Sequence, residues 1–169
     1  MKISILLPYK ENFSPNYPGA VSLFIKDVSG LSDFKKDIIV YGTTVFKKKF
    51  PLKYINLEIK KKTFKSQSED YIELFIKKEK INNSDLIEIH NRPSYLKYLI
   101  SNNINSKYIL YFHNDPLTMR GSKSIQDRNF LLNNCSRIVF NSQWSKKRFL
   151  QNIKSKNFNS EKLIIIYQS

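Results

Sequence analysis

A chain of 169 residues is long enough for one domain with a sizeable core, since single domains commonly span roughly 100–200 residues. Its 41% hydrophobic and 14% aromatic residues exclude a disordered chain, and its formal net charge of +15 favours an anionic partner such as a phosphate, a nucleic acid or an acidic membrane surface. The single cysteine, Cys135, excludes an intramolecular disulfide and a cysteine-based metal site, and two histidines are too few for a histidine-rich metal cluster.

Short apolar runs alternate with segments of helical spacing along the chain. Runs of about four to eight residues rich in Ile, Val, Tyr and Phe predict strands buried on both faces, as in parallel sheets. In chain order the predicted elements are a strand at Lys2–Pro8, a helix at Gly19–Ser29, strands at Asp37–Tyr41 and Lys53–Ile59, a helix at Glu69–Lys80, a strand at Asp85–His90, a helix at Pro93–Asn102, a strand at Lys107–His113, a helix at Ser124–Asn133, a strand at Arg137–Asn141, a helix at Gln143–Asn152 and a strand at Lys162–Tyr167. Repeated strand–helix units predict a doubly wound, mostly parallel, Rossmann-like α/β sheet with helices on both faces, in a single domain over residues 1–169.

Local residues support several of these boundaries. Ser66 and Glu69 have the spacing of a capping box, Pro93 suits the first turn of a helix, and Ser142 can cap the helix that follows it. The stretch 47–65 carries a run of three lysines on each side of its strand, Lys47–Lys49 and Lys60–Lys62. Because lysine discourages edge-to-edge pairing, this strand is predicted to lie at an edge of the sheet.

No segment indicates membrane insertion or export. The apolar run at Ile3–Pro8 is too short and lacks the cleavage region of a signal peptide. No apolar stretch approaches the roughly 18 residues needed to span a bilayer. We therefore expect a cytoplasmic protein whose membrane contact, if any, is peripheral and on the inner face of the membrane.

The carboxyl ends of the strands are where open α/β sheets bind ligands. Both histidines follow predicted strands and each precedes an asparagine, as His90-Asn91 and His113-Asn114. An imidazole and an amide can each donate hydrogen bonds to hydroxyl groups and accept hydrogen bonds from them, which suits a sugar. The alternative is that each pair caps the next helix.

Gly19, at the start of the first predicted helix, would let the backbone approach a phosphate closely. The alternative is that this residue is a simple turn glycine.

Several site classes lack their motifs. The chain has no GxGxxG, no GxxxxGK[ST] and no GxSxG, which argues against a dinucleotide fingerprint, a P-loop and a nucleophile elbow. Glu11 and Asp115 are the carboxylates at the strand ends. Such a pair can act as acid and base in glycoside hydrolysis, but capping or solvation is the more general interpretation. No RRM, KH or zinc-finger pattern is found, so no specific nucleic acid is expected.

Four segments together give the chain a family resemblance: ILLPYKENFSPNYPGAV (Ile5–Val21), DLIEIHNRPSYL (Asp85–Leu96), YILYFHNDPLTMRGS (Tyr108–Ser122) and CSRIVFNSQWSKKRFL (Cys135–Leu150). In order and spacing they resemble the N-terminal half of a retaining glycosyltransferase of family 4. The resemblance implies the two-domain glycosyltransferase B fold, in which an N-terminal domain binds the acceptor and a C-terminal domain holds the nucleotide-sugar donor. It implies no metal and no resident cofactor.

The resemblance also assigns residues. His113 matches the histidine that contacts the transferred sugar at the reaction centre and is the predicted catalytic residue. Gly19 matches the loop that approaches the donor diphosphate, although Pro18 precedes it where the family often has a second glycine. The predicted acceptor-binding residues are His90, Asn91, Arg92, Lys10, Glu11 and Arg120.

The chain departs from the family at Ser169, where the C-terminal domain and its paired glutamates would follow. We expect a truncated chain, a gene fragment or one half of a bipartite enzyme, inactive by itself, whose donor-side half is a C-terminal domain or a separate partner chain. The expected reaction is sugar transfer with retention from a nucleotide-sugar to a glycan or lipid-linked acceptor, as in lipopolysaccharide, capsule or glycolipid synthesis. The alternative is a non-catalytic Rossmann-like module that binds an anionic partner: a membrane surface, a phosphorylated ligand or a nucleic acid.

Overall fold

The fold is built on a seven-stranded sheet in the order β3-β2-β1-β4-β5-β6-β7. The computed structural model describes residues 1–59, 66–154 and 158–167. Its strands are β1 (Ile3–Leu6), β2 (Ile38–Gly42), β3 (Lys53–Asn56), β4 (Leu86–His90), β5 (Lys107–Phe112), β6 (Arg137–Phe140) and β7 (Leu163–Ile165), and its helices are α1 (Ala20–Gly30), α2 (Gln67–Asn82), α3 (Tyr95–Ser101), α4 (Ile125–Asn134) and α5 (Gln143–Leu150). All six neighbouring pairs of strands are parallel. The predicted α/β fold class is confirmed.

The chain changes its winding direction between β1 and β4. From β1 it passes outward through β2 to β3, and then returns to place β4 beside β1, with Ile5 paired to Glu88. It continues outward in the other direction through β5, β6 and β7. Loops that leave neighbouring strands in opposite directions open a crevice at their carboxyl ends. The site described below lies at this point.

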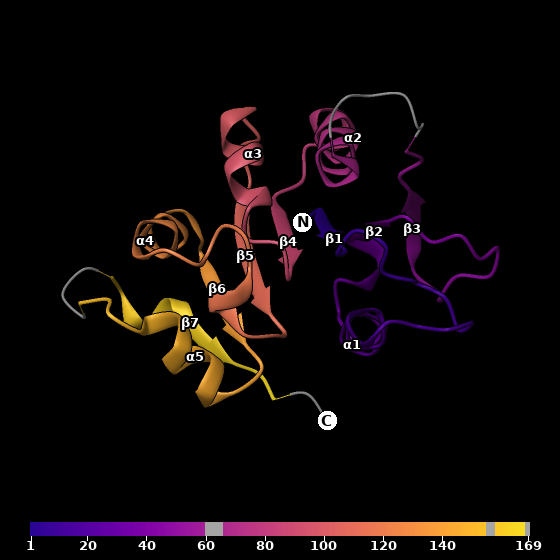
Figure 1. The fold of residues 1–169 in the computed structure, drawn as a ribbon. Helices are drawn as coiled ribbons and strands as arrows, with labels where there is room; N and C mark the ends of the chain where they lie inside the picture. The colour runs from indigo at the N-terminus through magenta and orange to yellow at the C-terminus, as the bar shows by residue number, and fades with distance from the viewer. Residues whose placement is uncertain (60–65, 155–157, 168–169) are drawn as a thin grey trace.

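The sheet separates two hydrophobic cores. On one face, Val21 and Ile25 of α1 pack in one cluster with Ile5 of β1 and Val40 of β2. The other cluster draws on α2, α3, α4 and α5, and includes residues such as Phe75, Leu96, Leu131 and Phe149. Figure 1 shows α1 on the opposite side of the sheet from α2, α3 and α4. Helices therefore cover both faces, as predicted.

The strands differ in how deeply they are buried. Every residue of β1 and β2 is buried, as the apolar runs predict. In β5, by contrast, Tyr108, Leu110 and Phe112 are buried while Ile109 and Tyr111 are half-buried, so the prediction of burial on both faces is wrong for this strand. The reason is that the core formed with α1 centres on β1 and β2 and reaches β4 only at Leu86.

The predicted helix caps at Ser66 and Ser142 are confirmed. The Ser66 side chain accepts a hydrogen bond from the Glu69 backbone, and the Glu69 carboxylate accepts one in return from the Ser66 backbone. The Ser142 hydroxyl accepts from the Ser145 backbone at 3.1 Å. A second capping box, formed by Ser124 and Asp127, was not predicted although its residues have the same spacing.

Some boundaries differ from those predicted. α3 begins at Tyr95, so Pro93 lies before the helix and not in its first turn. β3 ends at Asn56 and β7 at Ile165, each shorter than its apolar run, because pairing with the neighbouring strand stops there. Sequence patterns report side-chain burial, whereas strand ends depend on backbone partners.

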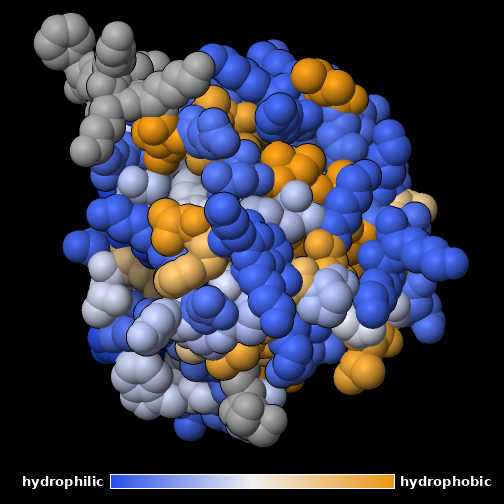
Figure 2. Space-filling view, turned by 90° about the vertical axis from the view of Figure 1, so that its right-hand side faces the viewer, coloured by the Kyte–Doolittle hydropathy of each residue, from blue (hydrophilic) through white to orange (hydrophobic). Residues whose placement is uncertain are grey.

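The predicted edge strand is confirmed, since β3 is the first strand of the sheet. Lys47, Lys48 and Lys53 are exposed around it, whereas Lys60–Lys62 lie outside the described residues. Figure 2, which views the molecule from the β3 side, shows a mostly hydrophilic surface with scattered apolar side chains. Among the helices of the described residues, none is long and apolar enough to cross a membrane.

Candidate functional site

A pocket of about 340 Å³ lies beside the carboxyl ends of β1, β4 and β5. Its lining consists of Pro8, Tyr9, Lys10, Glu11, Ala20, Val21, Asn91, Arg92, His113 and Asn114. The lining includes predicted site residues from the loops after three different strands: Lys10, Glu11, Asn91, Arg92 and His113. We call this cavity the central pocket. It lies at the change in winding direction, where the fold favours a ligand site.

His113 is held on several sides at the edge of the central pocket. Its backbone N–H donates to Asn91 Oδ1 at 2.8 Å, and its carbonyl accepts from Asn141 Nδ2 at 2.7 Å. Its Nε2 lies 2.9 Å from His90 Nδ1, and the Phe24 ring of α1 packs against it edge-on at 5.3 Å between centroids. The imidazole is thus placed by neighbours from β4, β6 and α1, which suits a group that must meet a ligand in one orientation.

His90 lies behind His113 and not on the surface of the central pocket. It ends β4 in the middle of the sheet, its side chain is 0% exposed, and its ring stacks on Tyr111 with centroids 4.4 Å apart. Its predicted place on the acceptor surface is therefore wrong, because β5 and Phe24 cover the ring. Asn91 is also mostly buried and adopts a positive φ of 53°. Its side chain holds the backbone of His113, and the residue also lines the central pocket.

A second pocket of about 500 Å³ adjoins the first through Asn91 and Arg92. Its lining is Ser66, Ser68, Glu69, Asn91, Arg92, Ser94, Tyr95, Tyr98, Thr118, Met119 and Arg120. We call it the arginine pocket, after Arg92 and Arg120. Hydrogen bonds from Ser66 lower the pKa of the Glu69 carboxyl, which also accepts from the Tyr98 hydroxyl at 3.1 Å. Arg120, predicted beside the other acceptor residues, lies here and not in the central pocket.

Glu11 occupies the amino end of α1. Its Oε1 accepts a hydrogen bond from the Ser22 backbone N–H at 3.0 Å. A Cβ placed on Gly19 would come within 1.9 Å of the same oxygen, so the glycine makes room for the carboxylate. The position that the family resemblance assigns to a donor diphosphate is thus occupied by an acidic side chain, which is favoured there for the same reason as a phosphate. For Glu11 the capping interpretation is confirmed.

Replacing Gly19 by alanine is expected to displace the Glu11 carboxylate and to lower the free energy of unfolding by about 1 kcal/mol, the usual value of a helix cap. The backbone of Gly19, at φ −77° and ψ 156°, suits alanine, so the loss comes from the contact alone. Urea unfolding of Gly19→Ala, Glu11→Ala and the double variant measures it. The free-energy losses of the two single variants should not add in the double variant, because both substitutions remove the same interaction.

The matched control for this prediction is Gly30→Ala, at the other end of α1. No atom of the described residues would lie within 4 Å of a Cβ at Gly30. This variant should unfold at the same urea concentration as the wild type or at a higher one. Fully additive losses for Gly19→Ala and Glu11→Ala would contradict the cap.

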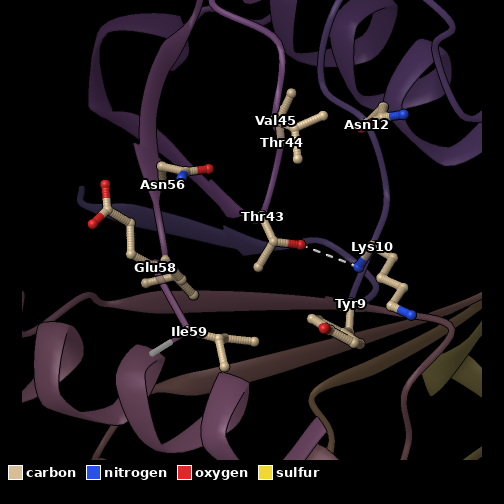
Figure 3. A pocket seen from close by; sticks show the side chains of 10 residues that line it. Tyr9, Lys10, Asn12, Thr43, Thr44, Val45, Asn56, Glu58 and Ile59 are labelled. Carbon is tan, nitrogen blue, oxygen red and sulfur yellow. Dashed lines mark hydrogen bonds between the residues drawn. The ribbon is translucent and has the colours of Figure 1, made fainter. Parts of the chain in front are cut away.

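Lys10 separates the central pocket from a third pocket of about 630 Å³ at the ends of β2 and β3. The third pocket is lined by Tyr9, Lys10, Asn12, Thr43, Thr44, Val45, Asn56, Leu57, Glu58 and Ile59, and Figure 3 shows these side chains. The Lys10 backbone has a positive φ of 70°, and its N–H donates to Thr43 Oγ1 at 3.2 Å. The loop after β1 is therefore tied to the loop after β2, and Lys10 can contact a ligand in either pocket.

Asp115 takes a capping role at the end of β5. Its carboxylate accepts from the Leu117 backbone at 3.0 Å and pairs with Arg148 of α5 at 3.0 Å. The hydrogen bond from Arg148 lowers the pKa of Asp115. Both candidate acid–base carboxylates are thus engaged in capping. Within the described residues no group of three or more His, Cys, Asp and Glu side chains could hold a metal ion.

Sequence reasoning did not identify Glu88, Tyr111 and Phe24 as neighbours of the two histidines. Glu88 Oε2 lies 3.6 Å from His90 Nε2, and the centroid of the Phe24 ring lies within 6.3 Å of the centroids of both imidazoles. One signal was present for Glu88: it stands two residues before His90 on the same strand, so both side chains point to one face. For Phe24, on α1, nothing in the sequence marks the contact.

The fold is similar to that of two solved proteins, HepE and sucrose-phosphate synthase. HepE of Anabaena in complex with UDP and glucose aligns with a TM-score of 0.61 and 18% identity, over 100% of this chain and 45% of that chain. HepE in complex with UDP-glucose aligns with a TM-score of 0.63 and 17% identity, over 99% of this chain and 43% of that chain. Sucrose-phosphate synthase from Thermosynechococcus elongatus aligns with a TM-score of 0.60 and 10% identity, over 100% of this chain and 90% of that chain.

These likenesses concern the fold: the chain shares its parallel α/β architecture with the matched parts of HepE and sucrose-phosphate synthase. The chain spans less than half of the HepE chain. A scan of the sequence against protein-family models finds no match, and a search of curated proteins finds none either.

Proposed function

We propose that this chain is the acceptor-side half of a retaining glycosyltransferase of family 4, which transfers a sugar from a nucleotide-sugar to a glycan or lipid-linked acceptor. The observation that carries the proposal is the central pocket: predicted residues from three separate loops line one cavity in a fold shared with a UDP-glucose-bound protein. The acceptors we favour are those of lipopolysaccharide, capsule or glycolipid synthesis, on the inner face of the membrane.

In this proposal His113 meets the transferred sugar. An imidazole held by backbone and ring contacts can bond a sugar hydroxyl in one orientation, and bonds that tighten in the transition state raise the rate. The donor phosphate would assist departure of its own leaving group, with the amides at the start of α1 stabilising the charge that develops. Because the Glu11 carboxylate accepts a hydrogen bond from one of those amides, it has to move away before a diphosphate can bind there.

The acceptor would lie along the central and arginine pockets. Arg92 lines both cavities, and Arg120 lines the second. Guanidinium groups bind phosphates through paired hydrogen bonds, so the two arginines suit a phosphorylated acceptor. The net charge of +15 supports attraction to an anionic lipid surface. No step of this mechanism requires a metal ion.

The donor-side half would be a C-terminal domain or a separate partner chain, since this chain spans 43–45% of the HepE chain. The 169-residue chain is then expected to transfer no sugar by itself. Sequencing the source gene beyond the codon for Ser169 tests for a second α/β domain in the same reading frame. Transfer of labelled sugar only when both halves are present would support the division.

The proposal is tested on the present chain by titrating UDP-glucose and following amide NMR signals. We expect weak binding, with a dissociation constant on the order of 1 mM, and shifts confined to residues that line the central pocket. UDP and glucose alone, and an Arg137→Ala variant at the amino end of β6, serve as controls. No shift at the central pocket would contradict the proposal. Salt-sensitive binding to anionic vesicles or DNA, without UDP-glucose binding, would favour the anion-binding module.

A further inference from the structure

A row of polar side chains runs behind His113 beneath the central pocket. Glu88 and His90 stand two residues apart on β4, and His113 follows the neighbouring strand β5. Glu88 Oε2 lies 3.6 Å from His90 Nε2, and His90 Nδ1 lies 2.9 Å from His113 Nε2. We call this arrangement the Glu88–His90–His113 relay. It joins a carboxylate to the imidazole that lines the pocket.

The relay decides which nitrogen of each ring carries a proton. A neutral imidazole has one N–H donor and one acceptor nitrogen, so the contact between the rings needs one of each. His90 Nε2 is fully buried and has no hydrogen-bond partner among the described residues, and the Glu88 carboxylate is the charge beside it. A proton on Nε2 is attracted by that carboxylate, whereas a lone pair there would be repelled. His90 Nδ1 is therefore the acceptor, and His113 Nε2 the donor.

Neighbouring rings keep the relay in place. Tyr111 stacks on His90 with an angle of 10° between the planes. Burial, with the Glu88 carboxylate nearby, raises the pKa of the Tyr111 hydroxyl, which therefore stays protonated. Phe24 of α1 packs against both imidazoles. Because the Glu88 side chain is only 18% exposed, solvent screens little of the attraction between its carboxylate and a proton on His90 Nε2, 3.6 Å away.

We propose that Glu88 and His90 are positioning residues that hold His113 as its Nε2-protonated tautomer, so that the imidazole offers a sugar hydroxyl an acceptor nitrogen, Nδ1. The tautomer follows from the geometry, whereas the role toward a sugar rests on the proposed function. Neither Glu88 nor His90 touches the ligand. Both act through the orientation and protonation of His113.

Nitrogen NMR of the imidazoles tests the tautomer directly. The chain contains two histidines, so a His113→Asn variant assigns both sets of signals. In the wild type we expect protonated Nε2 and unprotonated Nδ1 in both rings, at a pH where both are neutral. A proton on His90 Nδ1 would overturn the proposal. This measurement needs no substitution in the relay, so a poorly folding variant cannot obscure it.

Two sets of variants test the positioning role. Glu88→Gln keeps the side-chain shape but removes the charge, and should give mixed tautomers in both rings, while the exposed Glu161→Gln should change neither. His90→Asn places an amide oxygen near the position of Nδ1 and should preserve the His113 tautomer, whereas His90→Leu should not. Unchanged spectra in Glu88→Gln would remove Glu88 from the relay. A normal His113 tautomer in His90→Leu would remove His90.

UDP-glucose titration separates the relay from the proposed function. We expect Glu88→Gln to bind UDP-glucose about tenfold more weakly than the wild type, because a misoriented group loses its hydrogen bond. If the wild type shows the expected tautomers but no binding, the proposed function fails and the tautomer assignment stands. If Glu88→Gln loses the tautomer but binds equally well, the positioning role toward the sugar is overturned.

Discussion

Replacing His113 by alanine is expected to lower the turnover of the complete enzyme at least about tenfold, or roughly 1.4 kcal/mol of transition-state stabilisation. In the proposed function this imidazole bonds the transferred sugar at the reaction centre. The structure places it at the edge of the central pocket, held by Asn91 and His90. Steady-state kinetics with both halves of the enzyme present would measure kcat and kcat/KM.

The fold should survive this substitution, since His113 is half-buried and its backbone bonds to Asn91 and Asn141 remain available. Thermal unfolding of His113→Ala checks this point. His113→Gln, whose side chain retains polar atoms, should recover part of the lost turnover. Near-wild-type turnover of a correctly folded His113→Ala protein would remove His113 from the reaction.

Replacing Phe112 by alanine is expected to lower the free energy of unfolding by about 3–5 kcal/mol, as large-to-small changes in well-packed cores do. Phe112 ends β5, is 1% exposed, and packs against Phe140 and Phe149 with ring centroids 5.6 and 5.5 Å away. Alanine would leave a cavity between β5, β6 and α5. The residue next to it is His113, so the loss would also loosen the central pocket.

Urea unfolding, followed by far-UV circular dichroism, measures this effect. Phe112→Leu fills most of the space and should cost less than the alanine change. Phe34→Ala provides the surface control, because this ring is 47% exposed and should contribute within about 0.5 kcal/mol. Equal losses for Phe112→Ala and Phe34→Ala would contradict the assignment of Phe112 to the core.

The sequence predicted the fold class well because its signals are local. The apolar runs at β1 and β2, the capping box at Ser66 and the N-cap at Ser142 each depend on residues within a few positions of one another. The carboxyl ends of the strands were located for the same reason. Those ends singled out the two His-Asn pairs, whereas the family resemblance added Lys10 and Arg92 and assigned the catalytic role to His113.

The predictions that failed depend on contacts between distant segments. The burial of His90 results from stacking on Tyr111 and from Phe24 of α1, and neither contact leaves a pattern in the sequence. The cap formed by Glu11, which the sequence offered as one interpretation, also joins distant segments, because its carboxylate reaches Ser22 where Gly19 has no side chain. Arg120 lies in the arginine pocket and not in the central pocket, because the loop after β5 carries it there.

By itself, the sequence determined a parallel α/β sheet with its polar residues at the carboxyl ends of the strands, because hydrophobic periodicity and helix caps are encoded over short distances. Only the tertiary structure decided which of those residues share a cavity, which one is buried and which side chains surround His113. Those properties depend on side chains brought together from β4, β5 and α1, and they arise when the sheet and its helices pack.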